Sequence, residues 1–292
     1  MRLCVTGKQG QLAQSIQQCK GADVDLTFVG RPVFDLSNPD TILRSLDEAQ
    51  PDIVISAAAY TAVDQAESDA DKAFAVNAIG AEAVAKAAEK LGVPILHLST
   101  DYVFPGTATR QYRETDATGP QTVYGRTKLE GESRVAEACS RHLILRTAWV
   151  YSPFGKNFVR TMLNAAVERD QVSVVGDQTG NPTSALDLAE ALIHIARSLH
   201  DKKVEEYGIF HICGSGNTDW SEFATHIFAC SAALGGPVAQ VKPISTAEYP
   251  LPAKRPANSS LDCTKLLSTF GWQLPDWRIS TNVVVRQLLG RS

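Results

Sequence analysis

The chain has 292 residues, 44% of them hydrophobic and 21% charged, and carries a formal net charge of −4. This length suffices for one large domain or two modest ones, and the acidic balance excludes the basic footprint that nucleic acid or anionic lipid requires. No run approaches the roughly 18 apolar residues of a membrane-spanning helix, and a glycine at position 7 comes too early for a signal-peptide core. We expect a cytoplasmic protein without nucleic-acid or membrane partners.

The six cysteines lie at positions 4, 19, 139, 213, 230 and 263, with no CxxC pair among them. Scattered cysteines in an acidic chain of this size indicate reduced thiols in the cytosol. The sequence has no HExxH motif and no clustered Cys/His run, so it predicts no metal site.

A short apolar segment over residues 2–6 predicts the first strand, and a helical stretch ending near Lys20 follows two glycines. Gly7 permits a tight turn, and Gly10 lets the backbone approach a pyrophosphate held at the helix N-terminus. Ala13 takes the third small position of a G-x-x-G-x-x-A spacing. Strand, glycine turn and helix in this order favour nucleotide binding over an ordinary connection.

The second predicted strand, residues 24–29, ends in Gly30 and Arg31 without the carboxylate that would bind an adenosine 2′-hydroxyl. Arg31 can pair with a 2′-phosphate, which favours NADPH. The sequence is equally compatible with an ordinary solvated arginine at this position. A helix is expected to begin near Ser37 or Asn38.

Residues 53–56 predict a buried parallel strand, and the small residues 57–59 follow it. Small residues at the carboxyl end of such a strand leave room for a ligand, or they reflect close backbone packing. A D-x-x-E spacing at Asp64 marks a helix start, and this helix is expected to run to Leu91, before a Gly-Val-Pro stop. Asn77 within it either holds a partner behind the site or faces solvent.

The fourth predicted strand, residues 95–98, is followed by Ser-Thr-Asp at residues 99–101. Hydroxyls and a carboxylate at this edge of a parallel sheet lie where ligands bind, and the same residue types also form turns. The loop over residues 102–121 is long enough to suggest a functional role. A fifth strand over residues 142–147 ends in Ala-Trp-Val-Tyr at residues 148–151.

Tyr124 and Lys128 are four residues apart at the front of a predicted helix. One helical turn places the phenol and the ammonium on the same face. A phenol normally titrates near ~10, and a neighbouring ammonium favours the phenolate and lowers that pKa. The pair therefore predicts a proton donor with the group that tunes it, the alternative being a chance YxxxK on a solvated helix.

The second half is less regular. Its predicted elements are helices over 157–168, 186–199 and 219–234, strands over 172–175 and 208–213, and short helices over 261–270 and 279–289. Residues 235–260 are rich in Pro, Ala and Ser and are expected to run extended. Within them, Lys254 and Arg255 are adjacent cations that can clamp a diphosphate or stand as solvated surface charge.

The glycine turn, Ser-Thr-Asp after the fourth strand and the YxxxK pair together resemble the extended short-chain dehydrogenase/reductase superfamily. Within it, the resemblance is narrowed to the dTDP-4-dehydrorhamnose reductase family by residues 57–64, 99–104, 124–128, 146–151, 177–183 and 255–259. It runs nearly end to end. It implies an α/β fold with a Rossmann-type doubly wound parallel sheet over residues 1–150, taking back roughly 180–213, and a smaller C-terminal substrate-binding α/β domain, mainly 151–292.

The resemblance implies reduction of dTDP-4-dehydro-L-rhamnose at C4 by hydride from NADPH or NADH, the last step of dTDP-L-rhamnose synthesis. Tyr124 would protonate the C4 oxygen, Lys128 would lower the phenol pKa and hold the nicotinamide ribose, and Thr100 would hydrogen-bond the carbonyl. The residues expected to contact the dTDP-sugar are Thr100, Asp101, Trp149 and Arg255. Those expected to line the coenzyme, besides Tyr124 and Lys128, are Gly7, Gly10, Gln11, Leu12, Arg31, Asp35, Leu36, Ala57, Ala58, Ala59 and Tyr60.

The chain departs from the family at one place. Some members bind Mg²⁺ at a dimer interface through glutamates on the first helix and on the helix after the GxPT loop. This chain has Ser15 at the first position, and the later acids fall at Asp187 and Glu190 in a shifted pattern. We therefore expect no such metal and doubt that dimer, which leaves a monomer and a homodimer both open.

Two other functions stay open. One is a nucleotide-sugar epimerase or 4,6-dehydratase of the same superfamily, although a dehydratase follows its Ser/Thr with Asp-Glu, and here Tyr102 follows Asp101. The other is a non-catalytic regulatory subunit, as in the methionine adenosyltransferase partner built on this fold. Intact Tyr124, Lys128 and Thr100 argue against it.

Overall fold

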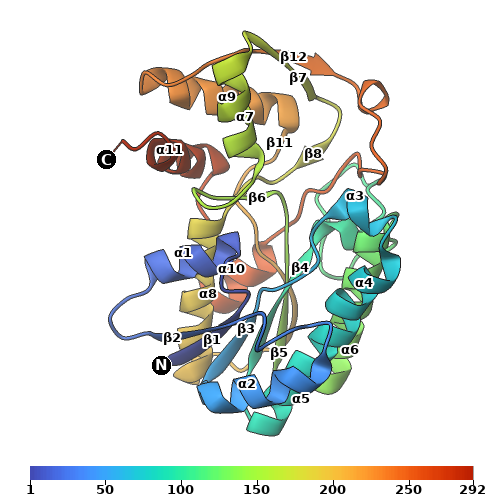
Figure 1. Ribbon diagram of the computed structural model, residues 1–292, viewed down its shortest axis with the longest axis vertical. Coiled ribbons are helices and arrows are strands. Elements are labelled where there is room, and N and C mark those ends of the chain that lie inside the picture. The colour runs from blue at the N-terminus through green and yellow to red at the C-terminus, as the bar shows by residue number, and fades with distance from the viewer. Residues whose placement is uncertain (292) are drawn as a thin grey trace.

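The computed structural model of the protein describes residues 1–291 and is built around a sheet of six parallel strands (Figure 1). In chain order they are β1 (Arg2–Thr6), β2 (Asp25–Val29), β3 (Ile53–Ser56), β4 (Ile95–Thr100), β5 (His142–Thr147) and β10 (Gly208–His211). They lie in the order β10-β5-β4-β3-β1-β2, and their pairings are all parallel. The order reverses between β1 and β3, the topological switch point at which doubly wound sheets bind nucleotides. The predicted fold class is confirmed.

Helices cover both faces of the sheet (Figure 1). One face carries α1 (Gln11–Cys19), α8 (Ala185–His200) and α10 (Thr264–Phe270). The other carries α2 (Ile42–Ala49), α5 (Ala81–Leu91) and α6 (Val123–Ala138). The central strands are mostly apolar because both of their faces pack under helices. Although α8 and β10 come much later in the chain, they complete one helical layer and the sheet.

A smaller lobe lies beyond the carboxyl ends of the strands, at the top of Figure 1. It contains α7 (Phe158–Glu168), α9 (Trp220–Ala233), α11 (Trp277–Leu288) and the parallel pair β7 (Gln171–Val175) and β12 (Gln240–Ile244). Its own core includes Tyr151, Phe223 and Trp277. Two further short pairs link the lobe to the sheet, namely β6 (Val150–Tyr151) with β9 (Thr183–Ser184) and β8 (Thr179–Gly180) with β11 (Thr218–Asp219).

The prediction of a single helix from Asp64 to Leu91 is wrong. The structure has α3 (Val63–Ala66), α4 (Ala70–Phe74), a π-helical segment (Ala75–Gly80) and then α5. After α3 the chain turns so that the Glu67 carboxylate accepts the N–H of Val123, at 2.9 Å. The π-helical segment passes so close to Leu36 that a Cβ at Gly80 would lie 2.5 Å from its carbonyl oxygen. Both causes are tertiary contacts, which the local pattern does not contain.

Three other segments differ from the elements predicted from the sequence. The helix expected near Ser37 begins at Ile42, after a 3₁₀ turn (Pro39–Thr41). The helix expected over 261–270 begins at Thr264, because Leu261 forms a β-bridge with Tyr112 instead. The segment 235–260 is interrupted by a 3₁₀ turn (Thr246–Glu248). Within residues 1–291, no helix has the length and apolar character needed to cross a membrane.

Candidate active site

Close packing at its first turn positions the N-terminus of α6. The Thr122 hydroxyl accepts the N–H of Gly125 at 3.0 Å and caps the helix. A side chain at Gly125 would collide with the carbonyl oxygen of Tyr102, in the 3₁₀ turn (Asp101–Val103) that follows β4. Glycine therefore lets α6 start directly against the end of β4, which brings Tyr124 to the carboxyl edge of the sheet.

Tyr124 is half-buried, and its ring stands edge-on to Tyr102, with ring centroids 5.6 Å apart. Burial raises the pKa of Tyr124 to about 12, although the nearby Thr100 hydroxyl lowers it. This direction is opposite to the one expected from the YxxxK spacing, because removal from water outweighs any pull towards the phenolate. The phenol is therefore protonated at neutral pH and can donate a proton.

Lys128 is buried, and its ammonium is held by two groups of β4. Nζ donates to the Leu98 carbonyl at 2.6 Å and lies 3.3 Å from His97 Nε2. The other ring nitrogen, His97 Nδ1, lies 3.2 Å from the Ser56 hydroxyl on β3. Burial lowers the pKa of Lys128 to about 8 and, with the Lys128 charge nearby, lowers the pKa of His97 well below its usual value. The neutral imidazole therefore accepts from the ammonium, a role for His97 that sequence reasoning missed.

Thr100 and Asp101 lie beside Tyr124, as expected for the end of β4. The Thr100 hydroxyl donates to Asp101 Oδ1 at 2.9 Å and accepts the N–H of Tyr102 at 3.2 Å. Asp101 is 3% exposed, and its Oδ2 has no hydrogen bond of good geometry within residues 1–291. Burial raises the pKa of Asp101 to about 6, against the lowering effects of Thr100 and of the nearby Ser259 hydroxyl. Asp101 is thus a buried carboxyl group whose Oδ2 can accept a further hydrogen bond.

The glycine turn has the backbone geometry that a pyrophosphate needs. Gly7 has φ +92°, which favours glycine, and its N–H donates to Val29 at 2.9 Å. The N–H of Gly10 donates back to the Gly7 carbonyl at 3.0 Å. No side chain caps the start of α1, so its first N–H groups can bind an anion. Gln11 at that start accepts from Ser152, at 2.9 Å, and so ties α1 to the second half of the chain.

Partly buried hydrogen bonds fix the backbone of residues 57–60, which follow β3. The Thr6 hydroxyl accepts the N–H groups of Ala57 and Ala58 at 3.0 and 2.9 Å. Asn77 is 1% exposed and clamps the backbone of Tyr60, accepting its N–H at 2.8 Å and donating to its carbonyl at 3.1 Å. Asn77 therefore holds a backbone partner inside the protein and does not face solvent, which decides between the two alternatives left open by the sequence. Ala57, Ala58, Ala59 and Tyr60 are all half-buried, as are Gln11 and Leu12.

The structure places Arg31, Asp35 and Leu36 in the turns after β2. Arg31 is exposed, and Leu36 is buried against α2 and α5. The Asp35 carboxylate accepts the hydroxyl and the N–H of Ser37, at 2.7 and 2.9 Å, which lowers its pKa. The charge of Arg31 lies near enough to add to that lowering.

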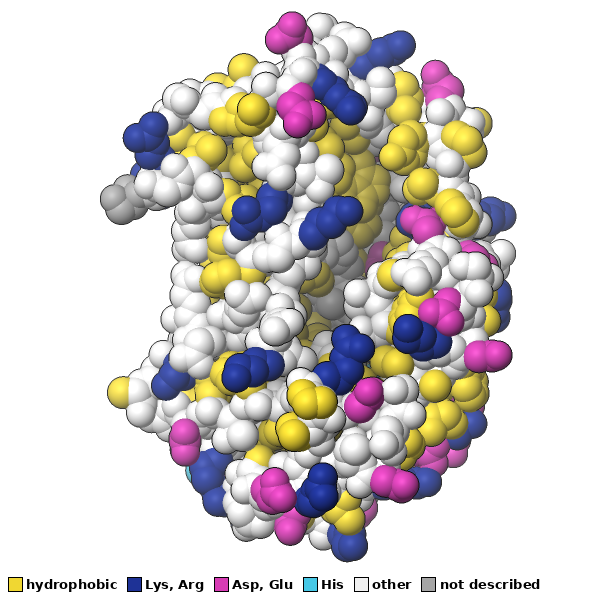
Figure 2. All heavy atoms as spheres, viewed as in Figure 1, with side chains coloured by type: hydrophobic (Ala, Val, Ile, Leu, Met, Phe, Trp, Pro, Cys, Tyr) yellow, Lys and Arg dark blue, Asp and Glu magenta, His cyan; other side chains and the backbone are white. Residues whose placement is uncertain are grey.

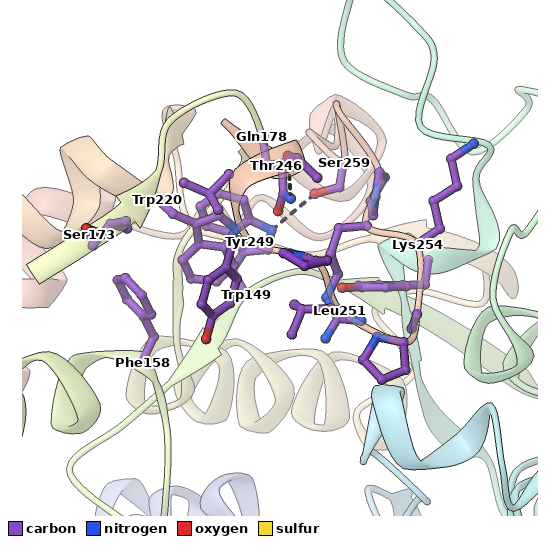
Figure 3. Close-up of a pocket in the computed structure, with 18 of the residues that line it drawn as sticks. Trp149, Phe158, Ser173, Gln178, Trp220, Thr246, Tyr249, Leu251, Lys254 and Ser259 are labelled. Carbon is purple, nitrogen blue, oxygen red and sulfur yellow. Dashed lines mark hydrogen bonds between the residues drawn. The ribbon is translucent and has the colours of Figure 1, made fainter. Parts of the chain in front are cut away.

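A pocket of about 540 Å³ lies between the sheet and the smaller lobe, the right size for a ligand of a few rings. Figure 2 shows this hollow, with hydrophobic side chains on its upper wall. Trp149 and Trp220 stack there with ring centroids 3.6 Å apart, and the Trp149 indole N–H donates to Ser259 at 3.2 Å (Figure 3). Tyr102 also lines the pocket, so the aromatic wall adjoins Tyr124. Trp220 is a contributor that sequence reasoning missed.

Arg255 lines the pocket, but its charge is balanced. Its Nη2 lies 2.7 Å from the Asp64 carboxylate, which also accepts the N–H of Ala253 at 3.1 Å. Lys254 is exposed and points away from Trp149 (Figure 3). The two cations therefore do not converge, and the Asp64–Arg255 pair joins the two sides of the cleft.

A buried ion pair fixes α6 over the sheet. Arg146 on β5 and Glu132 on α6 are 2% and 3% exposed and lie 2.6 Å apart. The Ser99 hydroxyl also donates to Glu132, at 2.5 Å, and the guanidinium lies over the Phe104 ring at 5.0 Å. Sequence reasoning missed this pair, because Arg and Glu are mostly surface residues and no local pattern marks them as buried.

The residues discussed for a shared Mg²⁺ have other partners. Ser15 is buried and donates to the Gln11 carbonyl at 2.9 Å. Asp187 accepts the hydroxyl of Ser280 on α11, and burial raises its pKa. Across residues 1–291, no three His, Cys, Asp or Glu side chains gather in a way that could hold a metal ion.

Known proteins resemble the chain over nearly its whole length. Residues 1–289 match the family model of the RmlD substrate binding domain. The chain is 51% identical to a dTDP-4-dehydrorhamnose reductase of Sinorhizobium fredii, over 99% of this chain and 98% of that protein. It is also similar to the crystal structure of a dTDP-4-dehydrorhamnose reductase from Clostridium acetobutylicum, with TM-score 0.91, 38% identity and coverage of 99% and 100%. The structure of the Bacillus anthracis dTDP-4-dehydrorhamnose reductase in complex with NADP has TM-score 0.90, 34% identity and coverage of 98% and 99%. The chain therefore belongs to the RmlD family, that of the dTDP-4-dehydrorhamnose reductases.

Proposed function

We propose that the protein reduces dTDP-4-dehydro-L-rhamnose to dTDP-L-rhamnose with NADPH, or NADH, in the cytoplasm. Family membership supports this reaction. The observation that carries it is the protonated phenol of Tyr124 beside the Thr100 hydroxyl, at the carboxyl edge of a parallel sheet. Two hydroxyls there can both donate to one oxygen on which negative charge develops.

The residues around the switch point fit a dinucleotide. Gly7 adopts the left-handed φ of the tight turn, and a Cβ there would lie 3.3 Å from Ala58 Cβ. We assign the pyrophosphate to the open N-terminus of α1, and the coenzyme-binding part to residues 1–150 with roughly 180–213. The latter contain α8, which packs on α1, and β10, which completes the sheet. When bound, the reduced nicotinamide supplies the hydride.

The protein supplies the proton and holds the reacting oxygen. Tyr124 Oη gives its proton to the C4 oxygen as that oxygen gains charge. The Thr100 hydroxyl, which donates to Asp101 Oδ1 in the free protein, turns to donate to the same C4 oxygen. Lys128 sits one helical turn behind Tyr124, where its ammonium can hold the nicotinamide ribose while Leu98 and His97 fix its position. We assign the sugar nucleotide to the pocket lined by Trp149 and Arg255. Asp101 lies near Ser259 of the pocket wall, and we assign it to the sugar end of the ligand.

The pH dependence should report Lys128. Burial lowers its pKa to about 8, so the ammonium is present below that pH and is lost above it. We expect kcat/KM for the reduction, which reports groups of the free enzyme, to fall as the pH rises through about 8. Steady-state rates from about pH 6 to about pH 10 test this. In Lys128→Arg the descending limb should disappear from this range, since a guanidinium stays charged; an unchanged limb would assign it to another group.

His97 should act as a positioning residue for Lys128. His97→Leu removes the acceptor 3.3 Å from Nζ, and we expect kcat to fall about 10-fold, with a shifted descending pH limb and a smaller change in KM for the sugar. His97→Gln keeps an acceptor and should recover part of the rate. His142→Gln, whose ring lies at the start of β5 and binds the Cys139 carbonyl, is the matched control. Equal rates for all three variants would show that His97 only fills space.

A direct assay separates the proposed function from its alternatives. Supplied with dTDP-4-dehydro-L-rhamnose, the protein should consume NADPH, or NADH, in stoichiometric amounts, measured as loss of reduced-nicotinamide absorbance. An epimerase or dehydratase regenerates its coenzyme and would show no net consumption. A regulatory subunit would show no turnover and would co-purify with a catalytic partner.

A further inference from the structure

Two cysteines far apart in the chain meet beside the cleft. The sulfurs of Cys213 and Cys263 lie 3.3 Å apart although 50 positions separate them. Cys213 follows β10 and is 3% exposed, whereas Cys263 precedes α10 and is partly exposed. Both belong to the apolar cluster that contains Leu261 and, at its edge, Trp149.

The surroundings give the two thiols different roles. The contact with Cys263 and burial raise the pKa of Cys213 well above its usual value, so Cys213 is a protonated, shielded thiol until it attacks an oxidised Cys263 and gives up its proton. Its sulfur also lies 3.8 Å from the Leu261 carbonyl oxygen, which keeps it turned towards the 261–263 segment. Cys263 is the more exposed residue of the pair. A diffusible oxidant therefore meets Cys263 first, with a second sulfur already in contact.

We propose that Cys213 and Cys263 are a modification site, at which a hydroperoxide forms a reversible intramolecular disulfide. The Cys263 sulfur attacks the peroxide, an S–O bond forms and the O–O bond breaks. The released oxygen takes the Cys263 thiol proton and leaves as water or alcohol. The Cys213 sulfur then attacks the sulfenic sulfur of Cys263. The S–S bond forms, the S–O bond breaks, and the hydroxyl leaves as water with the Cys213 proton. The two thiols lose two electrons and two protons in total, and the peroxide is reduced.

The geometry singles out this pair among the six cysteines. The sulfurs need to close from 3.3 Å to about 2.05 Å, a movement within the reach of side-chain rotation. The sulfur of Cys19 faces the Leu186 carbonyl at 3.7 Å, and that of Cys230 faces His226 at 3.4 Å. Cys4 and Cys139 are buried among the hydrophobic side chains of the sheet core. Within residues 1–291, none of those four sulfurs makes the sulfur–sulfur contact that joins Cys213 to Cys263.

The bond would fasten a segment that shapes the pocket. Residues 257–261 pair with the Thr179 strand, through hydrogen bonds of 2.8 Å between Thr179 and both Ala257 and Ser259. The N–H of Leu261 donates to Asn181 at 2.8 Å, and Ser259 holds the Trp149 indole. Cross-linking the end of this segment to the chain after β10 removes freedom from the unfolded state. The oxidised protein should therefore unfold at a higher temperature than the reduced one.

The test treats the intact, folded protein with a small excess of hydrogen peroxide, removes the peroxide, and then unfolds the protein in denaturant with iodoacetamide so that every free thiol is blocked. We expect a mass loss of two hydrogens with two fewer alkylated thiols, reversed by dithiothreitol. Trypsin should release residues 204–254, with Cys213 and Cys230, and residues 255–265, with Cys263. These peptides should be joined without reductant, with fragmentation placing the bond at Cys213, and the thermal midpoint should rise on oxidation.

Three variants make the result decisive. Cys230→Ser should keep the linked peptides and the rise in thermal midpoint, whereas Cys263→Ser and Cys213→Ser should lose both. Cys263→Ser changes a partly exposed side chain and so serves if Cys213→Ser fails to fold. A bond to Cys230, or alkylation of both Cys213 and Cys263 after peroxide treatment, would overturn the proposal. So would a sulfinic acid on Cys263 without cross-linked peptide.

Discussion

Replacing Tyr124 by phenylalanine is expected to lower kcat for the reduction by about 10²- to 10⁴-fold while coenzyme affinity stays nearly unchanged. The substitution removes the hydroxyl that we propose gives its proton to the C4 oxygen. It keeps the ring and its edge contact with Tyr102, at 5.6 Å between centroids, so the start of α6 should not move. Single-turnover rates measure the chemical step, and coenzyme fluorescence measures binding.

A second tyrosine controls for the loss of a hydroxyl. Tyr207 lies half-buried just before β10, among residues that the mechanism does not use. Tyr207→Phe should turn over at the unaltered rate. Turnover of Tyr124→Phe at that same rate would show that another group is the acid, and Thr100 would be the first to examine.

Replacing Glu132 by alanine is expected to destabilise the folded protein by about 3–5 kcal/mol. The change leaves the Arg146 guanidinium, 2% exposed, without the carboxylate that holds it at 2.6 Å. It also removes the acceptor of the Ser99 hydroxyl, next to Thr100 at the carboxyl end of β4. The midpoint of urea unfolding measures the loss.

The control for this substitution lies half a turn away on the same helix. Glu130 pairs with Arg134 at 2.7 Å, but both side chains are substantially exposed, at 43% and 31%. Exposed pairs contribute about 0–1 kcal/mol, so Glu130→Ala should shift the midpoint little. Equal shifts for the two variants would mean that burial of the Arg146–Glu132 pair carries no special weight.

The sheet could be predicted from sequence because its strands are short apolar runs with clear ends. Residues 53–56 lie between Pro51 and a run of alanines, and residues 95–98 lie between Pro94 and Ser-Thr-Asp. The expected strands and the observed ones agree to within a residue or two at β1, β2, β3, β4 and β5. Local composition carries that information, since parallel strands buried on both faces are almost wholly apolar.

The features that sequence reasoning predicted wrongly or missed depend on contacts between segments that are distant along the chain. The breaks in the expected 64–91 helix follow from the bond of Glu67 to α6 and from the approach to Leu36. The raised pKa of Tyr124 follows from burial, which spacing along a helix does not reveal. His97 is a polar residue inside an apolar strand, and its role depends on Lys128, 31 positions later. The partner of Arg255, Asp64, is still farther away in sequence.

A crystal structure of the protein with oxidised coenzyme and dTDP-L-rhamnose would test the central claim most directly. The account predicts that Tyr124 Oη and Thr100 Oγ1 both lie about 3 Å from the C4 oxygen of the sugar, with the C4 carbon facing the nicotinamide. It also predicts the Lys128 ammonium against the nicotinamide ribose. A structure in which another side chain holds the C4 oxygen, and the Tyr124 hydroxyl points away from the sugar, would contradict it.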